Sequence, residues 1–208
     1  MEQEPQGGIS KEEEAQILAQ DRKDQAEWER IRPRIWVGSL ADYNAGILHG
    51  EWINADRDAE EVWQDIHDML KQSPTPGAEE WGVFDYEGFG GVPIAEYHPI
   101  EAITALACGI REHGLAFAGW AGLRADAPNV GESFEYAYLG EWDSIEAFAD
   151  NIIEDLGIQD VIDRLVPEDL RHYVTIDIRG LARDLEMSGD IITVDVPGGG
   201  VWVYDGRV

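Results

Sequence analysis

Residues 34–53 read RIWVGSLADYNAGILHGEWI, and this stretch determines the architecture that we expect for the first part of the chain. Its two ends, Arg34–Leu40 and Ile47–Ile53, are rich in the β-branched and aromatic residues that are typical of strands. The segment between them, Ala41–Gly46, contains Asn and Gly, which favour a turn or a short loop. The stretch therefore predicts two neighbouring strands with a short connection.

The residues after this stretch predict one helix and a third strand. Asp58 and Glu61 can cap a helix that runs to about Leu70, with apolar side chains along one face. Residues 73–77, SPTPG, end this element, and Glu80–Tyr86 returns as a strand. The order strand, strand, helix, strand predicts a small antiparallel sheet with a helix on one face.

The middle of the chain is predicted to be helical. Residues 93–124 carry apolar side chains at helical spacing, and Gly114 divides them into two helices. We expect a linker over Asp126–Gly131 and a strand over Phe134–Leu139. The helical segment is therefore expected to be a compact, less charged unit.

The last part of the chain predicts helices followed by a closing hairpin. Asp143 and Glu146 can cap a helix that stops at Gly157. The elements expected after it are a helix over Asp160–Leu165, a helix after Pro167, a helix over Ile178–Met187, and the strands Asp190–Val196 and Val201–Tyr204, which Pro197–Gly200 joins as a hairpin. The pattern as a whole predicts the α+β class.

Acidity dominates the composition. The chain carries 43 Asp and Glu against 15 Lys and Arg, a formal net charge of −28. Between Asp42 and Glu101 there are 14 acids and two bases, and between Asp126 and Asp169 there are 13 acids and one base. A body with such a field repels nucleic acid and anionic membranes, so we expect it to bind neither. Its expected partners are basic surfaces.

The acids of one predicted helix lie in a stripe. Glu146, Asp150 and Glu154 follow one another at intervals of four residues. Each like-charge pair at this spacing destabilises a helix by roughly 0.2–0.5 kcal/mol. A solvated helix face is the simpler interpretation of such a run, but the scarcity of Lys on any comparable face favours a binding surface.

Motifs for catalysis or cofactor binding are missing from the sequence. Residues 56–60 carry an acid at every second position, but the segment lacks the Gly and the terminal Glu of a calcium loop. The Gly-rich segments have no nucleotide-binding pattern, and the five His have no metal-ligand spacing. Cys108 is predicted to be a small core side chain. We therefore expect a protein that is not an enzyme and that uses no cofactor and no metal ion.

The sequence shows no membrane span, secretory signal or disulfide framework from which another compartment would be expected. No apolar run approaches the roughly 18–20 residues of a membrane span. The N-terminus is acidic and polar, unlike a secretory signal, and a single Cys excludes an internal disulfide framework. These features predict a soluble cytoplasmic protein.

Two alternative interpretations also fit the acidity. An acidic composition with only three Lys is consistent with adaptation to a high-salt cytoplasm, in a protein with an unrelated binding function. The second alternative is a metal enzyme built on carboxylates. The first predicts a fold that is lost in low salt, and the second predicts micromolar binding of divalent ions.

The chain resembles the ArdA antirestriction family. Residues 35–53 contain a strand followed by the pattern YN-x-G-x-L-x-G-x-W, which is similar to the opening of that family. Further similar segments follow in order: Phe84–Glu87, Gly157–Pro167, Tyr173–Asp177 and Ala182–Asp190. The resemblance extends from about residue 34 to residue 205, which makes it more specific than any single motif.

The resemblance implies an elongated α+β protein with small antiparallel sheets and packed helices in about three small domains. Ahead of the family core, Ser10 and Glu13 predict a capping box for a charged helix over about 11–31, which Pro33 ends. The expected divisions are an N-terminal extension (1–33), a strand–strand–helix–strand domain (34–92), a helical middle domain (93–128) and an α+β C-terminal domain with the dimer contact (129–208).

The resemblance also implies a function. Surface carboxylates of the family imitate the phosphates of B-form DNA and occupy the DNA-binding groove of type I restriction–modification enzymes, which protects an incoming plasmid or transposon, a mobile genetic element. The expected partners are such an enzyme, at its methyltransferase and specificity core, and a second copy in a homodimer. No single carboxylate should be essential, because the field is distributed.

We assign candidate residues to two surfaces. The DNA-mimic carboxylates are Asp42, Glu51, Asp56, Asp58, Glu60, Glu61, Asp65, Asp68, Glu79, Glu80, Asp85, Glu87, Glu141, Asp143, Glu146, Asp150, Glu154, Asp155, Asp160 and Asp163. The family's antirestriction motif corresponds to the segment near Gly157–Asp177, at or near the dimer contact, where we assign Gly157, Val161, Leu165, Val166, Pro167, Leu170 and Tyr173.

Overall fold

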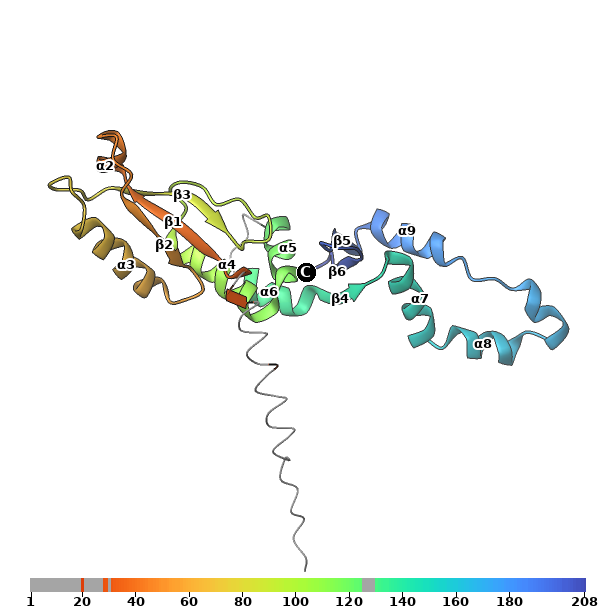
Figure 1. Cartoon of the computed structure of the whole chain (residues 1–208). Helices are drawn as coiled ribbons and strands as arrows, with labels where there is room; N and C mark the ends of the chain where they lie inside the picture. The colour runs from red at the N-terminus through yellow and green to blue at the C-terminus, as the bar shows by residue number, and fades with distance from the viewer. Residues whose placement is uncertain (1–19, 21–27, 30, 125–129) are drawn as a thin grey trace, which may run out of the picture. The chain divides into compact units, whose positions relative to one another are not determined.

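The structure is a computed structural model that describes residues 20, 28–29, 31–124 and 130–208 (Figure 1). Most of the helix predicted over 11–31 and most of the linker predicted over 126–131 lie outside these residues. The described chain forms two compact units. The first takes its described residues from Met1–Phe89 and Pro93–Arg111, and the second comprises Gly90–Val92 and Glu112–Val208.

A three-stranded antiparallel sheet is the centre of the first unit. Its strands are β1 (Arg34–Ser39), β2 (Gly50–Asn54) and β3 (Trp81–Glu87), in the order β2-β1-β3. The two strands predicted from residues 34–53 are therefore confirmed, although the second begins later than expected. The reason is local: the Ile47 amide donates to the Asp42 carbonyl and does not join the ladder.

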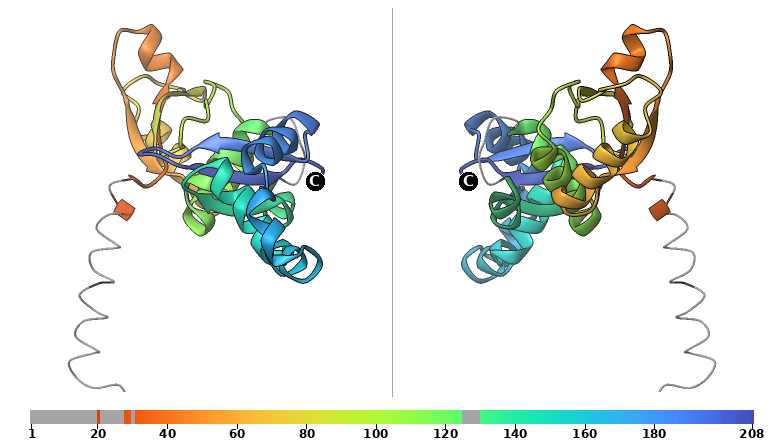
Figure 2. Two further views of the ribbon diagram at one scale, coloured as in Figure 1. Left: turned by 90° about the vertical axis from the view of Figure 1, so that its right-hand side faces the viewer. Right: turned by 90° about the vertical axis from the view of Figure 1, so that its left-hand side faces the viewer.

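The connection between the first two strands contains a short helix, α2 (Leu40–Asn44), where the sequence predicted a turn or loop. Ser39 is the N-cap of α2, and its hydroxyl accepts a hydrogen bond from the Asp42 amide. A serine side chain in this position satisfies an amide that would otherwise lack a partner. Figure 2 shows α2 at the end of the β1–β2 pair.

Helix α3 (Ala59–Lys71) contributes its buried face to the core of the first unit. In α3, the predicted apolar face is buried, with Val62 and Ile66 fully covered. Ile35 and Val37 of β1 are buried as well, and α3 packs against β2. Burial of each such side chain stabilises the fold by about 1.5–3 kcal/mol. The predicted helix on one face of the sheet is confirmed.

The helical segment that follows is divided at Gly114, as predicted. α4 (Ile100–His113) ends there and α5 (Leu115–Leu123) begins, with Gly114 at a φ of 71° that favours glycine. Of the predicted middle domain, Pro93–Arg111 belongs to the first unit, and the residues from Glu112 belong to the second. The division into three domains stays a prediction.

The second unit combines a second antiparallel sheet with helices. Its further elements are α6 (Val130–Ala137), β4 (Tyr138–Trp142), α7 (Ile145–Asp155), α8 (Ile158–Leu165), the 3-10 helix η1 (Glu168–Tyr173), α9 (Ile178–Ser188), β5 (Ile191–Asp195) and β6 (Val201–Asp205). The strand order is β4-β6-β5, so the predicted closing hairpin is confirmed.

Two local predictions in this unit were wrong. The strand predicted over Phe134–Leu139 is helical as far as Ala137, because Phe134 and Ala137 are both buried at helical spacing. The N-cap of α7 is Ser144 and not Asp143: the Ser144 hydroxyl accepts a hydrogen bond from the Ala147 amide at 3.1 Å. The predicted end is correct, since Gly157 takes up a left-handed conformation immediately after the helix.

The α+β fold class is confirmed by these two small antiparallel sheets with helices packed against them. None of the described helices is both long enough and apolar enough to cross a membrane.

Candidate acidic interaction surface

In the first unit, α3 presents acids on the side opposite its buried face. Glu60, Glu61 and Asp68 are exposed, while Val62 and Ile66 of the same helix are buried. The acids therefore lie on the solvent face because helical spacing separates them from the core. Asp58 stands at the N-cap, also exposed, although its side chain makes no cap hydrogen bond.

Two acids of α3 have cationic partners. Asp65 is bound by the Arg57 guanidinium, and Asp68 accepts a hydrogen bond from Lys71 Nζ at 2.7 Å. The hydrogen bond from Lys71, followed by one from Gln64, lowers the pKa of the Asp68 carboxyl. Asp68 therefore stays ionised at neutral pH, with only part of its charge compensated.

Glu51 on β2 belongs to the same electrostatic neighbourhood. Partial burial raises the pKa of its carboxyl, and the negative charges of Asp65 and Asp68 raise it further. These three carboxylates therefore repel one another across β2 and α3, an arrangement that opposes folding and that a basic partner would relieve.

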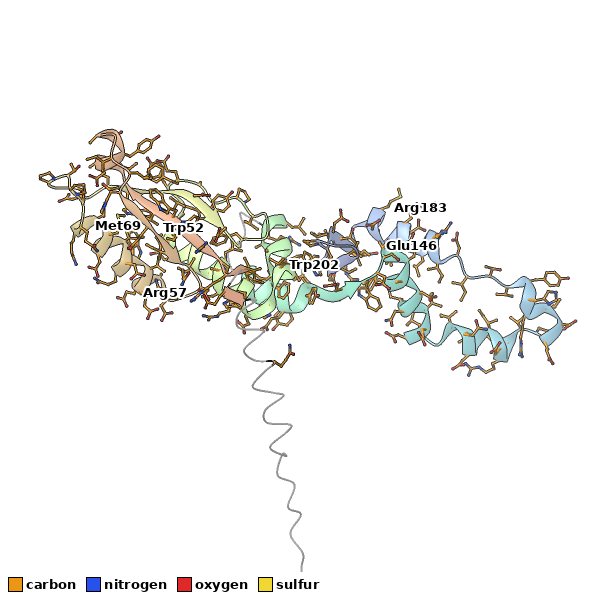
Figure 3. All side chains as sticks on the ribbon, viewed as in Figure 1. Trp52, Arg57, Met69, Glu146, Arg183 and Trp202 are labelled. Carbon is orange, nitrogen blue, oxygen red and sulfur yellow. The ribbon has the colours of Figure 1, made fainter. Side chains whose placement is uncertain are left out.

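In the second unit, the predicted stripe on α7 is confirmed. Glu146, Asp150 and Glu154 are exposed, while Phe148 and Ala149 of the same helix are buried (Figure 3 labels Glu146). Phe148 packs in a cluster with residues of β5 and β6, which sets the rotation of the helix. None of the three acids forms an ion pair with another described residue.

The remaining assigned acids are at the surface, with three exceptions. All assigned carboxylates except Asp42, Asp56 and Asp65 are exposed, and Asp65 is half-buried. Glu141 accepts a hydrogen bond from Trp202 Nε1 at 3.0 Å, and Glu87 is paired with Arg34. Neither contact covers the carboxylate.

Asp42 and Asp56 are buried and hold the first unit together. The Asp42 carboxylate accepts hydrogen bonds from the Ser73 hydroxyl at 2.6 Å and from the Thr75 hydroxyl. Asp56 accepts a hydrogen bond from Arg32 Nε at 2.6 Å. Neither carboxylate is available to a partner, so we leave both out of the proposed surface.

Two exposed acids of the same block were not assigned from the sequence. Glu96 and Glu101 lie on the surface of the first unit, and Trp63 Nε1 donates to Glu101 at 3.1 Å. Both belong to the acidic block between Asp42 and Glu101, which is the signal that could have identified them.

The segment assigned to the antirestriction motif presents apolar side chains to solvent. Leu165 is 73% exposed and Tyr173 is 75% exposed, with Val161 and Leu170 exposed as well. Pro167 is exposed and Val166 half-buried, while α8 buries no residue at all. Figure 1 shows α8 and the residues after it as an arm that leaves the second sheet. Such a patch is typical of an interaction site.

A groove accompanies this arm. It has a volume of about 600 Å³ and is lined by residues of α7, α8, η1 and the segment before α9, among them Asp150, Glu154, Asp160 and Arg171. Arg171 Nε donates to the Val166 carbonyl at 3.0 Å and thereby holds η1 against the end of α8. Its lining combines these charged side chains with apolar ones such as Ile153 and Ile162.

Among the described residues, no group of three or more His, Cys, Asp or Glu is arranged to hold a metal ion. Each unit, taken by itself, carries exposed carboxylates that are suited to bind cations of a partner.

Comparison with known proteins identifies the family. A search of the curated proteins gives no match. The family described as antirestriction protein (ArdA) matches residues 35–197, which is well over half of the chain and begins at the stretch that forms β1 and β2. The chain therefore belongs to the ArdA family of antirestriction proteins.

Proposed function

We propose that this antirestriction protein acts as a mimic of duplex DNA, which binds the DNA-binding groove of a type I restriction–modification enzyme and excludes DNA by competition. It acts without catalysing a reaction, as a homodimer, and protects incoming mobile DNA. The observation that carries the proposal is the stripe of Glu146, Asp150 and Glu154, exposed and without ion-pair partners among the described residues.

The regular repeat of this stripe supports mimicry. Four residues of α-helix advance about 6 Å, so the three carboxylates form an evenly spaced row of negative charges, as the phosphates of a DNA strand do, although at a lower charge density. Folding alone favours acids alternating with Lys at this spacing. The like charges therefore weaken the helix, which is consistent with selection for binding.

The net charge of a dimer is comparable to that of a stretch of duplex DNA. Residues 35–208 contain 34 acids and nine bases, so this part of each copy carries −25. Duplex DNA carries one charge per roughly 1.7 Å, so a dimer has enough charge for about 85 Å of duplex. Carboxylates cannot copy the base edges, so the target would be recognised through its contacts to the DNA backbone. Enzymes with different recognition sequences should then be inhibited alike.

The exposed apolar side chains of α8 and η1 support the dimer contact. Leu165, Leu170 and Tyr173 lie on a protein whose charge otherwise keeps copies apart. A second copy that covers these side chains would supply the hydrophobic burial needed to offset that repulsion.

A displacement experiment tests the proposal. A type I methyltransferase is bound to labelled duplex DNA, and the protein is added at increasing ratios. We expect release of the DNA near stoichiometric addition, with an affinity that falls as salt rises. If stoichiometric protein leaves the DNA bound, the proposal is wrong. Circular dichroism without added salt separates it from salt adaptation, which predicts unfolding there.

A further inference from the structure

The first sheet has one face covered by α3 and an opposite face that carries aromatic rings. In β1, Ile35 and Val37 point into the core, so the alternate residue Trp36 lies on the opposite face. Trp36 pairs directly with Trp52 of β2, which is 40% exposed. Aromatic rings therefore occupy positions where the solvent face of an acidic protein is expected to carry polar side chains.

Two glycines leave room for the Trp36 ring. A Cβ atom on Gly38 or Gly50 would come within 2.7 Å of the Trp36 ring, so the indole lies directly over both glycines. The Phe84 ring meets Trp36 edge to face, with centroids 5.7 Å apart, and the Tyr43 ring lies 5.2 Å from Phe84. We call Trp36, Tyr43, Trp52 and Phe84 the aromatic face.

The aromatic face stays open to solvent. Phe84 is 36% exposed and Tyr43 is 61% exposed, in addition to Trp52. The rings are inclined to one another, with Phe84 at 70° to Trp36 and at 39° to Tyr43, and the exposed ones present part of their π surfaces to solvent. Figure 3 labels Trp52 on this sheet.

One ring of the aromatic face already contacts a guanidinium, that of Arg34 in the same sheet. Arg34 Cζ lies 4.8 Å from the centroid of the Trp52 ring, and its Nε donates to the Glu87 carboxylate. A guanidinium is bound favourably where it stacks on an aromatic ring and pairs with a carboxylate beside it. Asp85 pairs with Trp36 in the ladder and is exposed, so a second carboxylate adjoins the rings.

We propose that the aromatic face binds arginine side chains of the DNA-binding groove of the inhibited enzyme; this rests on the proposed function. Charge complementarity selects this occupant, because the block that contains Tyr43, Trp52 and Phe84 has 14 acids against two bases and attracts a cationic surface. Arginine fits better than lysine, because its planar group stacks on aromatic rings while it binds carboxylates. The enzyme would thus be held by stacking contacts, which depend on the shape of the arginine side chain, as well as by the distributed charge.

The test changes the rings and leaves the charge at −28. The full-length double variant Trp52→Leu, Phe84→Leu is compared with wild type in the displacement experiment over a series of salt concentrations. We expect about tenfold weaker inhibition, the combined effect of two lost cation–π contacts. The salt dependence should keep its slope, because the number of charges is the same.

Controls separate the possible results. Tyr136→Leu removes an exposed ring of α6 and should inhibit like wild type. The variants Trp52→Phe and Phe84→Tyr keep π surfaces and should retain most of the inhibition, which guards against a double variant that fails to fold. Circular dichroism checks the fold of each.

Each outcome is decisive. If wild type displaces DNA and the folded double variant does so equally well, the aromatic face does not bind the enzyme and this inference is wrong, while the proposed function stands. If wild type displaces no DNA, the proposed function itself fails. If the double variant differs from wild type in its mass in solution, a second copy of the chain occupies the aromatic face. If the double variant inhibits like wild type but is less stable, the chain's own N-terminal residues occupy it. Both results would overturn the inference.

Discussion

The Asp42 carboxylate accepts a hydrogen bond from the Ser73 hydroxyl at 2.6 Å, across 31 residues of sequence. This contact joins α2, at the end of the β1–β2 pair, to the loop after α3. Burial alone would raise the pKa of Asp42, but hydrogen bonds from Ser73, Thr75 and Ser39 outweigh it and hold the pKa below its usual value. The buried charge is thus satisfied by hydroxyl groups.

The first prediction concerns this contact. Asp42→Asn should lower the melting temperature by several degrees, because an amide cannot accept from both hydroxyls in the same geometry. A carboxyl with a lowered folded pKa contributes stability above its unfolded pKa and loses it as pH falls through the folded pKa. Wild type should therefore lose stability below about pH 4, and the variant should lose less. Thermal melts between about pH 2 and pH 7 measure both effects.

The matched control is Asp58→Asn, which removes a charge from an exposed N-cap without a side-chain cap hydrogen bond. It should change the melting temperature little. If the two variants melt alike, the Asp42 contact does not hold the loop.

The second prediction separates binding from stability on α7. Changing Glu146, Asp150 and Glu154 together to the neutral amides removes two like-charge pairs, so the helix should gain about 0.4–1 kcal/mol. Inhibition of the restriction enzyme should nevertheless weaken, and reversal of all three to Lys should weaken it more than any single reversal. Thermal melts and DNA displacement provide the two readouts.

A charge-matched control tests whether arrangement matters. Glu112, Asp184 and Asp195 are exposed acids outside the proposed surface, and neutralising all three changes the net charge by the same amount. We expect a smaller loss of inhibition. An equal loss would show that total charge alone, and not the stripe, governs binding.

The third prediction concerns the dimer. Leu165→Ser with Tyr173→Ser should produce a monomer, because these exposed side chains of α8 and η1 are proposed to be covered by the second copy. Sedimentation should show the halved mass. The control Met187→Ser alters an apolar side chain on α9 that is 79% exposed, and should leave the dimer intact. A double variant that keeps the mass of wild type would place the contact elsewhere.

The fourth prediction concerns the core of the second unit. The Tyr204 hydroxyl is buried and donates to the Ala116 carbonyl at 2.7 Å. Burial, followed by the nearby Tyr138, raises the pKa of the Tyr204 phenol. A raised folded pKa means that the contribution to stability is complete below the unfolded pKa and is lost as pH rises. Wild type should therefore weaken above about pH 10.

Tyr204→Phe should destabilise the protein at neutral pH by about 1–3 kcal/mol, because the Ala116 carbonyl stays buried without a donor. The variant should also lose less stability above about pH 10. Chemical denaturation at neutral pH and above about pH 10 measures the two effects, with Tyr136→Phe, an exposed phenol on α6, as the control. No difference from this control would contradict the role of the buried hydroxyl.

The local pattern of residues in the sequence was sufficient to predict much of the secondary structure. The spacing of apolar residues predicts the buried face of α3 and, by the same argument, the exposed acids of α7. Gly114 and Gly157 mark element ends, because both take backbone conformations that favour glycine. Prediction failed over Phe134–Ala137, where aromatic residues favour a strand in isolation but pack as a helix against the rest of the second unit.

The sequence by itself determined the acidic charge, its two blocks, the family signature after Ile35 and most of the element order, α2 and α6 excepted, because each depends on composition or short-range periodicity. Only the tertiary structure decided which acids can meet a partner. The Asp42 carboxylate accepts hydrogen bonds from residues 31 and 33 positions away, and the Asp56 carboxylate accepts one from Arg32, 24 positions away. The aromatic face likewise exists only once β1, β2 and β3 pair. Contacts of such long range leave no periodic signal in the sequence, so burial and neighbourhood had to come from the fold.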